Sequence, residues 1–170
     1  MAEAVVGFGS SLGNRAGYMS LAASALALSP GVTGCRGSRI YASAPWGGAA
    51  TQVFLNAAVV FETTLQPVDL LKLCKSIEMR MGRKAGVRWA DRVLDLDVLW
   101  MEGVVLEEPG LCVPHPRLRQ RMFALRPLLE LVPNAKDAEG SPYRSSLVAG
   151  GGLSVTGVLA CGLRPAYPRA

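Results

Sequence analysis

The sequence predicts an α+β fold in which one antiparallel sheet carries helices on one face. Two observations support this prediction. The chain has 170 residues, half of them hydrophobic, which is enough for one domain with its own core. Strand-like and helix-like segments follow in the order β-α-β-β-α-β, and in that order two halves interleave into a single sheet, the ferredoxin-like layout. We therefore expect one domain over residues 1–170, with a core over about 4–133 and a helical or irregular C-terminal extension over 134–170.

The first half of the chain contributes three strands and one helix. Residues 4–8 are apolar and predict a strand, and we assign the glycines that follow to the turn after it. This turn is not a dinucleotide fingerprint, because G-x-G-x-x-G would need glycine where Leu12 stands. A helix is expected over 18–28. Residues 32–42 and the strongly apolar 54–63 predict the next two strands.

The second half begins with the clearest helix, over 67–82. Pro67 suits the first turn of a helix and Gly82 suits its end. Residues 93–100 are apolar apart from two aspartates and predict a strand. After a turn at 102–103 we expect a short strand over 104–106 and a helix over 124–131, which Pro127 could break. Residues 153–161 are either a last edge strand or poorly ordered.

Asp95 and Asp97 are the first candidates for a functional site. Side chains alternate along a strand, so both carboxylates point to the same face, with Cα atoms roughly 6.5 Å apart. In one interpretation they form structural ion pairs with the basic residues that precede them, Arg83, Lys84, Arg88 and Arg92. In the other, they hold Mg²⁺ while the basic residues bind the phosphates that the metal also contacts. The spacing alone favours neither interpretation.

Three other polar features have both a structural and a functional interpretation. Asn56 lies in an apolar strand, where its amide either bonds to backbone or recognises the edge of a heterocycle. Lys75 and Glu78 are three apart on a helix, which usually gives a solvated ion pair. His115, the only histidine, stands in a Pro-rich turn, where such a residue is more often just exposed.

Composition and charge exclude several classes of protein. The net charge of +5 comes without a run of lysines and with only 6% aromatic residues, which favours a cleft for an anionic small molecule over nucleic-acid binding. Four scattered cysteines without a C-x-x-C pair argue against zinc and against a disulfide framework. No apolar run approaches the ~20 residues of a membrane span, and no secretory signal is recognisable. We expect a cytoplasmic monomer that acts on small molecules and binds neither nucleic acid nor membrane.

Several motifs together resemble the hydroxymethyldihydropterin pyrophosphokinase family. They run from about residue 5 to about residue 133, and their order and spacing are specific although each alone is weak. The matching stretches are G-S-S-L-G-N-R at 9–15, F-L-N-A at 54–57, Ile77-Glu78 with Gly82-Arg83, Arg88-Trp89, Arg92 with L-D-L-D at 94–97, and V-P-H-P-R at 113–117 through Arg121 and Phe123.

The resemblance implies a reaction and a set of site residues. The family moves the terminal two phosphates of ATP to the hydroxymethyl oxygen of 6-hydroxymethyl-7,8-dihydropterin, and AMP leaves. It implies that Asp95 and Asp97 bind two Mg²⁺ ions and that Arg83 and Arg92 contact the reacting phosphates. The implied ATP contacts are Lys75, Glu78, Arg83, Arg88, Trp89, Arg92, His115 and Arg121. The implied pterin contacts are Ser43, Ala44, Trp46, Phe54, Asn56, Trp89 and Phe123.

The chain departs from the family pattern at three places. Ser11 stands where asparagine is more common, which concerns the first turn. The loop after Gly82 is one residue shorter, and Lys84 is the candidate replacement for its second arginine. Asp91 replaces a common proline, so we expect it either to weaken nucleotide affinity through its charge or to pair with a neighbouring arginine.

Two other classes fit the sequence less well. A ferredoxin-like RNA-binding or metabolite-binding module would explain the basic charge, but the K/R-G-F/Y pattern of exposed sheet aromatics is missing and the paired carboxylates would stay unexplained. An ordinary γ-phosphoryl kinase would need Walker or protein-kinase signatures, which the sequence lacks.

Overall fold

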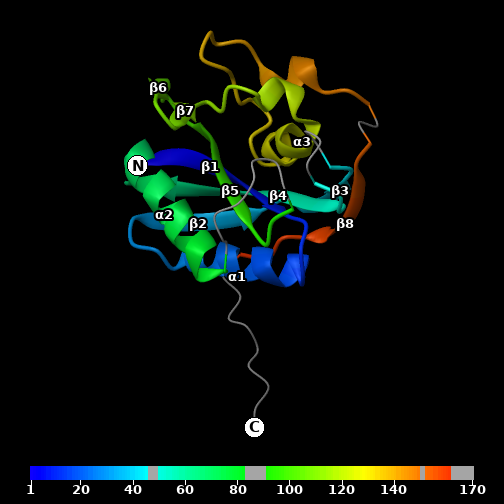
Figure 1. The fold of residues 1–170 in the computed structure, drawn as a ribbon. Coiled ribbons are helices and arrows are strands. Elements are labelled where there is room, and N and C mark those ends of the chain that lie inside the picture. Colours follow the sequence, from blue (N-terminus) through cyan, green and yellow to red (C-terminus); the bar gives the residue numbers. More distant parts are fainter. Residues whose placement is uncertain (46–49, 83–90, 150–151, 162–170) are drawn as a thin grey trace.

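A six-stranded antiparallel sheet forms the centre of the computed structural model, which describes residues 1–45, 50–82, 91–149 and 152–161 (Figure 1). The strand order is β5-β1-β4-β3-β8, and β2 also pairs with β4. This arrangement confirms the predicted α+β, ferredoxin-like sheet. The strands are β1 (Ala2–Ser10), β2 (Val32–Gly37), β3 (Arg39–Ser43), β4 (Phe54–Thr63), β5 (Asp95–Met101) and β8 (Ser154–Val158).

Helices cover both faces of this sheet. α1 (Arg15–Ala27) and α2 (Pro67–Arg80) pack on one face, against Val6 of β1 and its apolar neighbours (Figure 1). α3 (Met122–Leu131) packs on the opposite face, against Val5. The expectation of helices on one face only is therefore wrong. The central strands are buried along both faces, and a sheet that is apolar on both sides needs cover on both.

Several boundaries differ from the expected ones for local reasons. β4 spans the predicted residues, but the predicted strand 32–42 is divided at Ser38. The backbone N–H of Ser38 donates to Ala58 O at 2.9 Å, and its hydroxyl accepts from Ala58 N at 2.9 Å, so a side chain enters the ladder there. α1 begins earlier than expected because the Asn14 side chain accepts from Gly17 N at 3.1 Å and caps the helix.

The segment after β5 forms a hairpin and a third helix. β6 (Leu106–Glu108) lies two residues later than expected and pairs with β7 (Leu111–Val113), which the sequence did not predict. α3 runs through Pro127 without ending there, because the missing N–H removes only one bond of the helix. Two short 3₁₀ turns follow the hairpin and α3, at Leu118–Gln120 and Tyr143–Ser146.

The C-terminal extension returns to the sheet. β8 pairs with β3 as an edge strand. Of the two expectations for residues 153–161, an edge strand or a poorly ordered segment, the edge strand is confirmed. Arg119 binds the loop that leads there, through Asp137 and the hydroxyl of Ser146. Across the described residues, no helix combines the length and the apolar character that crossing a bilayer requires.

Candidate functional site

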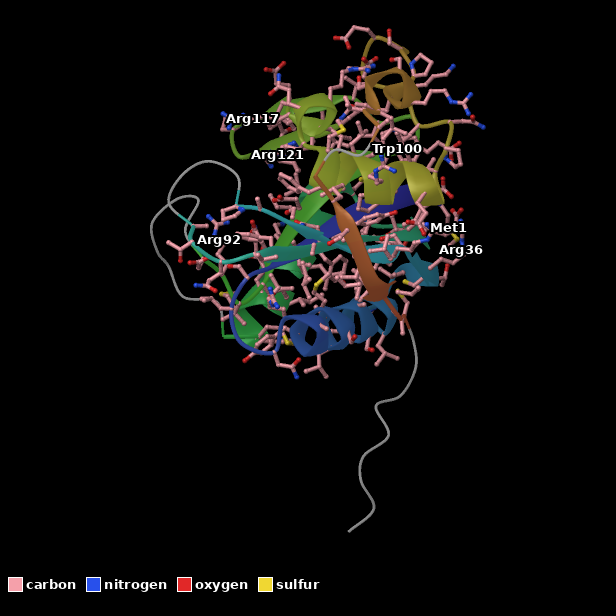
Figure 2. All side chains as sticks on the ribbon, turned by 90° about the vertical axis from the view of Figure 1, so that its right-hand side faces the viewer. Met1, Arg36, Arg92, Trp100, Arg117 and Arg121 are labelled. Atoms are coloured by element: carbon pink, nitrogen blue, oxygen red, sulfur yellow. The ribbon has the colours of Figure 1, made fainter. Side chains whose placement is uncertain are left out.

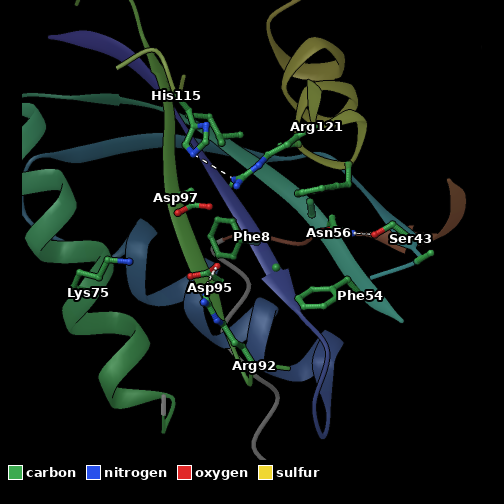
Figure 3. Close-up of a pocket in the computed structure, with 17 residues that line it drawn as sticks. Phe8, Ser43, Phe54, Asn56, Lys75, Arg92, Asp95, Asp97, His115 and Arg121 are labelled. Atoms are coloured by element: carbon green, nitrogen blue, oxygen red, sulfur yellow. Dashed lines mark hydrogen bonds and ion pairs between the residues drawn. The ribbon is translucent and has the colours of Figure 1, made fainter. Parts of the chain in front are cut away.

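A pocket of about 270 Å³ opens on the α3 face of the sheet, where β1, β4 and β5 lie next to one another (Figure 3). Most of the site residues that the sequence indicated line this pocket, although they come from distant parts of the chain. These are Ser43, Ala44, Phe54, Asn56, Lys75, Arg92, Asp95, Asp97, His115, Arg121 and Phe123.

The floor of the pocket is formed by residues of β1 and by the residues directly opposite them on β4 and β5. Gly9 lies opposite Asn56 of β4 and opposite Asp95 of β5, and Gly7 lies opposite Asp97. Residues directly opposite one another share a face, so the amide and both carboxylates face the pocket. A Cβ on Gly9 would lie 3.9 Å from Asn56 Oδ1 and 3.9 Å from Asp95 Cβ, in the space between them. Glycine keeps this space open.

The assignment of glycines to the turn after the first strand is wrong for Gly9 and correct for Gly13, which lies in that turn with a φ of +64°. Gly7 and Gly9 both lie within β1, and both line the pocket. Two glycines at a spacing of two in an apolar run place both bare positions on one face of a strand. That spacing was the signal in the sequence that could have indicated their role.

Asp95 and Asp97 both line the pocket, while Leu96 between them is buried against the α1 and α2 side. The prediction that the two carboxylates share a face is confirmed. Burial, together with the nearby charge of Asp95, raises the pKa of Asp97 to about 6. Arg92 Nη1 binds Asp95 Oδ2 at 2.8 Å, so the structural ion pair expected for one of the two aspartates is present.

A cation would reduce the repulsion between these two carboxylates. Within the parts of the chain that the structure describes, no group of three or more His, Cys, Asp or Glu side chains could hold a metal ion. A pair of carboxylates that leaves the remaining positions to water and substrate phosphates is the usual ligand set for Mg²⁺. The residues present therefore fit Mg²⁺ that is held jointly by the protein and the phosphates of a ligand.

Lys75 reaches the pocket from α2, beside the outer edge of β5 (Figure 3). Its Nζ lies 3.1 Å from Oε1 of Glu78, whose side chain is only 2% exposed. The same Oε1 accepts the backbone N–H of Leu96 at 2.7 Å. The pair is thus not the solvated one expected from the spacing. Glu78 does not line the pocket; it binds the free edge of β5 and positions Lys75.

The opposite side of the pocket combines an amide with aromatic side chains. Asn56 Nδ2 donates to Ser43 Oγ at 2.9 Å and to Tyr41 O at 3.3 Å, which orients the amide. Both N–H groups of the amide nitrogen are thereby used, and the carbonyl oxygen Oδ1 lies on the pocket side near Gly9. Phe54 from the start of β4 and Phe123 from the start of α3 also line this side.

His115 is half-buried and lines the pocket, so the expectation of a merely exposed histidine is wrong. Its Nδ1 accepts the backbone N–H of Arg117 at 3.2 Å, and its Nε2 lies 3.4 Å from Arg121 Nη1. Burial and the charges of Arg121 and Arg117 lower the pKa of His115 to about 4. The ring is therefore neutral at pH 7, with its proton on Nε2, because Nδ1 acts as an acceptor.

Basic side chains gather on one side of the molecule around this pocket. Figure 2 shows Arg117 and Arg121 near α3, with Arg92 on the same side of the molecule, further from α3. Arg92 is held at its backbone, because its N–H donates to Ser11 Oγ at 2.9 Å and its C=O accepts from Ser11 N at 2.9 Å. The residue before it, Asp91, accepts hydrogen bonds from Thr51 and Gln52 and does not pair with an arginine of the described chain.

Five of the residues singled out in the sequence lie outside the described residues, so their expected roles stay predictions: Trp46, Arg83, Lys84, Arg88 and Trp89.

Most of the chain is similar in sequence to one family of proteins. A sequence profile of the 7,8-dihydro-6-hydroxymethylpterin-pyrophosphokinase (HPPK) family matches residues 5–133. The 2-amino-4-hydroxy-6-hydroxymethyldihydropteridine pyrophosphokinase of Methylorubrum extorquens is 41% identical over 134 residues, covering 79% of this chain and 85% of the relative. The protein of the same name from Bacillus subtilis is 40% identical over 128 residues, covering 75% of this chain and 77% of the relative.

Solved structures show the same fold. The crystal structure of wild-type Plasmodium falciparum HPPK-DHPS matches with a TM-score of 0.61 and 14% identity, and the match covers 85% of this chain and 40% of that chain. Because the profile spans most of the chain and the bacterial relatives are about 40% identical over most of their length, the chain belongs to the 7,8-dihydro-6-hydroxymethylpterin-pyrophosphokinase family.

Proposed function

We propose that this chain transfers pyrophosphate by holding the pterin and the triphosphate of ATP next to each other in the pocket on β1, β4 and β5. The reaction of the family takes the terminal pyrophosphate of ATP to the hydroxymethyl group of 6-hydroxymethyl-7,8-dihydropterin and releases AMP, in folate biosynthesis. One observation supports the assignment of residues: Asn56, Gly9 and Asp95 form one row across three strands, so the amide proposed to bind the pterin and a carboxylate proposed to bind the metal face the same space.

The pterin occupies the side of the pocket near β4. Phe54 and Phe123 stack on the two faces of its ring, and offset stacking contributes roughly 0.5–1.5 kcal/mol beyond the burial of area. Asn56 Oδ1 accepts a hydrogen bond from the ring edge, since its amide nitrogen already binds Ser43 and Tyr41. Ser43 and Ala44 line this side of the pocket, and Trp46 and Trp89, which lie outside the described residues, are proposed as further pterin contacts.

The phosphates occupy the side near β5. Asp95 and Asp97 would hold Mg²⁺, with two ions proposed, and bound Mg²⁺ would neutralise charge on the reacting phosphates. Arg92 and Arg121 bind phosphate oxygens, for which the planar guanidinium is suited. His115 donates from Nε2, and Lys75 contributes a positive charge from α2. Arg83, Arg88 and Trp89 are proposed as further nucleotide contacts, and Glu78 acts through Lys75.

In the transfer, the hydroxymethyl oxygen of the pterin attacks the β-phosphorus and the bond from that phosphorus to the α–β bridging oxygen breaks. The bridging oxygen leaves with AMP, and the hydroxyl proton goes to solvent. Positioning of the two substrates and neutralisation of charge are sufficient for this class of phosphoryl chemistry, and no residue of the pocket needs to act as a strong base.

The location and the oligomeric state of the protein stay predictions. We propose a cytoplasmic monomer that acts on ATP and the pterin as its only partners. What supports a reducing compartment is that Cys35, Cys74, Cys112 and Cys161 are all free thiols.

Analysis of the nucleotide product tests the proposal directly. The protein is mixed with ATP, Mg²⁺ and 6-hydroxymethyl-7,8-dihydropterin, and AMP is separated from ADP. We expect AMP, and only when the pterin is present. ADP would indicate a γ-phosphoryl kinase, and AMP formed without the pterin would indicate hydrolysis; either result would contradict the proposed pocket.

A further inference from the structure

The carboxylate of Asp91 joins two segments that lie 40 residues apart in the chain. Its Oδ2 accepts from Thr51 N at 3.2 Å and from Thr51 Oγ1 at 3.0 Å, and its Oδ1 accepts from Gln52 N at 3.2 Å. Both oxygens are thus occupied by the same short segment. Desolvation acts to raise the pKa of Asp91, but hydrogen bonds from Thr51, Gln52 and Ser11 outweigh it, so this pKa lies below its ordinary value.

This contact lies just beyond the ends of the sheet ladder. The pairing of β1 with β4 ends at Ser10 and Leu55, and the pairing of β1 with β5 ends at Gly9 and Asp95. Past these points β1 pairs with neither neighbour, and Phe54 is paired only with Ser43 of β3. Side-chain hydrogen bonds, together with the backbone bonds from Ser11 N and Leu12 N to Arg92 O, join the segments there.

Two further contacts lie beside the contact of Asp91 with Thr51 and Gln52, and we call the three together the junction. Ser11, which follows β1, exchanges hydrogen bonds with the backbone of Arg92, with Arg92 N to Ser11 Oγ at 2.9 Å. Arg15 Nη1 donates to Val53 O at 2.7 Å. The segments that leave β1, enter β4 and enter β5 are therefore joined at one place.

The junction connects the two halves of the pocket. Gln52 lies two residues before Phe54, which lines the acceptor side, and Asp91 directly precedes Arg92, which binds Asp95 on the phosphate side. In Figure 3, Phe54 and Arg92 lie at the same end of the pocket, on either side of β1. The distance between the side chains of Phe54 and Arg92 depends on the junction. Apart from the junction, the backbones of these two residues are held only by the strands that begin at or after them.

We propose that Asp91 is a positioning residue, whose carboxylate binds the segment entering β4 to the segment entering β5 and thereby aligns the acceptor side of the pocket with the phosphate side. The proposal rests on the proposed function. The carboxylate is used by backbone and hydroxyl donors and pairs with no arginine of the described chain, while the expected effect of its charge on nucleotide affinity stays a prediction. Transfer between two bound substrates is sensitive to such alignment, and a misplacement of 1 Å can cost about 10²-fold in rate.

The central experiment measures kcat and both KM values of Asp91→Ala and Asp91→Asn. Asp91→Ala removes both acceptor oxygens. In Asp91→Asn an NH₂ group takes the place of one oxygen and faces groups that can only donate or already donate, so this variant also breaks the contact. We expect kcat to fall about 10- to 100-fold while each KM changes less than about 3-fold. Asp69→Asn is the matched control, because Asp69 is an exposed carboxylate whose partner is Lys72 on α2, and its kcat should stay at the wild-type value.

A double-mutant cycle tests whether Asp91 acts through Thr51. Thr51→Val removes the hydroxyl donor at nearly constant shape, and Thr51→Ser restores it. We expect Thr51→Val to lower kcat, Thr51→Ser to recover it, and Thr51→Val to add little in the background of Asp91→Ala. If the effects of the two substitutions on the free energy of activation were simply additive, the proposed contact would be excluded as the cause.

A measurement without turnover separates this proposal from the proposed function. Amide hydrogen exchange of Thr51 and Gln52 should accelerate in Asp91→Ala, whereas exchange of Gly17, capped by Asn14, should not change. Wild-type protein that forms no AMP would overturn the proposed function, whatever these amides do. An active protein in which Asp91→Ala keeps its kcat, or changes only the KM for ATP, would overturn the positioning role and would favour an effect of charge alone.

Discussion

At the scale of single residues, Asp97 shows that the pocket is built at a cost in stability. Its pKa is raised to about 6 by burial and by Asp95. A carboxyl group whose pKa is higher in the folded state favours folding at pH below its unfolded pKa, and this contribution is lost as the pH rises through about 6. We expect Asp97→Asn to abolish nearly all turnover and to raise Tm in metal-free buffer at pH 8, by about 2–4 °C for each kcal/mol of relieved repulsion.

The measurement is thermal unfolding in EDTA at pH 4 and at pH 8, together with the rate of AMP formation. The difference in Tm between Asp97→Asn and wild type should be small at pH 4 and larger at pH 8. Asp69→Asn serves as the control for the rate, which should stay at the wild-type value. A variant at Asp97 that kept most of its activity would refute the assignment of this residue as a metal ligand.

His115 provides a second prediction at this scale, with the opposite sign. Its pKa is lowered to about 4, so the unfolded chain takes up a proton on this residue at a higher pH than the folded protein does. The stability that the neutral ring contributes is therefore present above pH 6.5 and is lost as the pH falls towards 4.

Because the chain holds one histidine, its NMR signals are directly assignable. We expect the chemical shifts of the ring to stay constant from pH 5 to pH 9, at values typical of the Nε2–H tautomer. Titration near pH 6.5, or shifts typical of the Nδ1–H tautomer, would show that Arg117 N–H does not fix the ring as inferred.

At the scale of elements, the glycines of β1 determine what the pocket can hold. A Cβ on Gly9 would make only ordinary contacts at 3.9 Å, so Gly9→Ala should fold normally. Its methyl group would nevertheless occupy space between Asn56, Phe54 and Asp95. We expect pterin affinity to fall by about 10-fold, which corresponds to 1.4 kcal/mol, with little change in Tm. Titration calorimetry with the pterin in the presence of a non-hydrolysable ATP analogue measures the affinity.

Gly7→Ala is the matched comparison on the same strand. A Cβ there would lie 2.9 Å from Leu99 Cδ1, so the side chain of Leu99 must move. We expect this variant to lose about 1–3 kcal/mol of stability through overpacking. Equal effects of the two substitutions on pterin affinity and on Tm would mean that Gly9 has no special relation to the ligand.

The elements also show where the sequence was informative. β4 and α2 were predicted closely because their signals are local: a long apolar run in one case, and Pro67 with helical spacing in the other. The division at Ser38 and the burial of Glu78 could not be predicted, because each depends on a partner far along the chain. Ser38 takes part in the ladder only through Ala58, and Glu78 is buried because the free edge of β5 offers the N–H of Leu96.

Some features of the site could likewise be predicted from local sequence, and others depend on distant partners. The alternation of Asp95 and Asp97 follows from strand geometry alone, and their shared face was predictable. That Asn56 and Asp95 lie on either side of Gly9 depends on the strand order and register, which local patterns do not contain. The family resemblance brought these residues together, whereas the partners of Asp91 required the fold.

At the scale of the whole molecule, a few polar residues help to hold the C-terminal extension on the core, beside the pairing of β8 with β3. Arg119 binds Asp137, Ser141 O and Ser146 Oγ, and its guanidinium lies 4.8 Å from the centre of the Tyr143 ring. Trp100 Nε1 donates to Lys136 O at 3.0 Å on the same side. The extension is thus held by these hydrogen bonds together with the pairing of β8 with β3 and the buried side chains of Ala135, Tyr143 and Leu159.

This arrangement predicts that stability and catalysis can be separated at Arg119. Arg119→Ala removes the partner of several polar groups in the extension, so we expect a loss of about 1–3 kcal/mol of stability. Because Arg119 does not line the pocket, kcat measured well below the lowered Tm should stay within about twofold of wild type, as expected for a change that acts only on the unfolding equilibrium. Arg144→Ala, at an exposed arginine of the same extension, is the control and should change neither quantity. Thermal unfolding and AMP formation on the same preparations measure both, and a loss of kcat without a loss of stability would mean that the extension takes part in the pocket and is more than a support for the sheet.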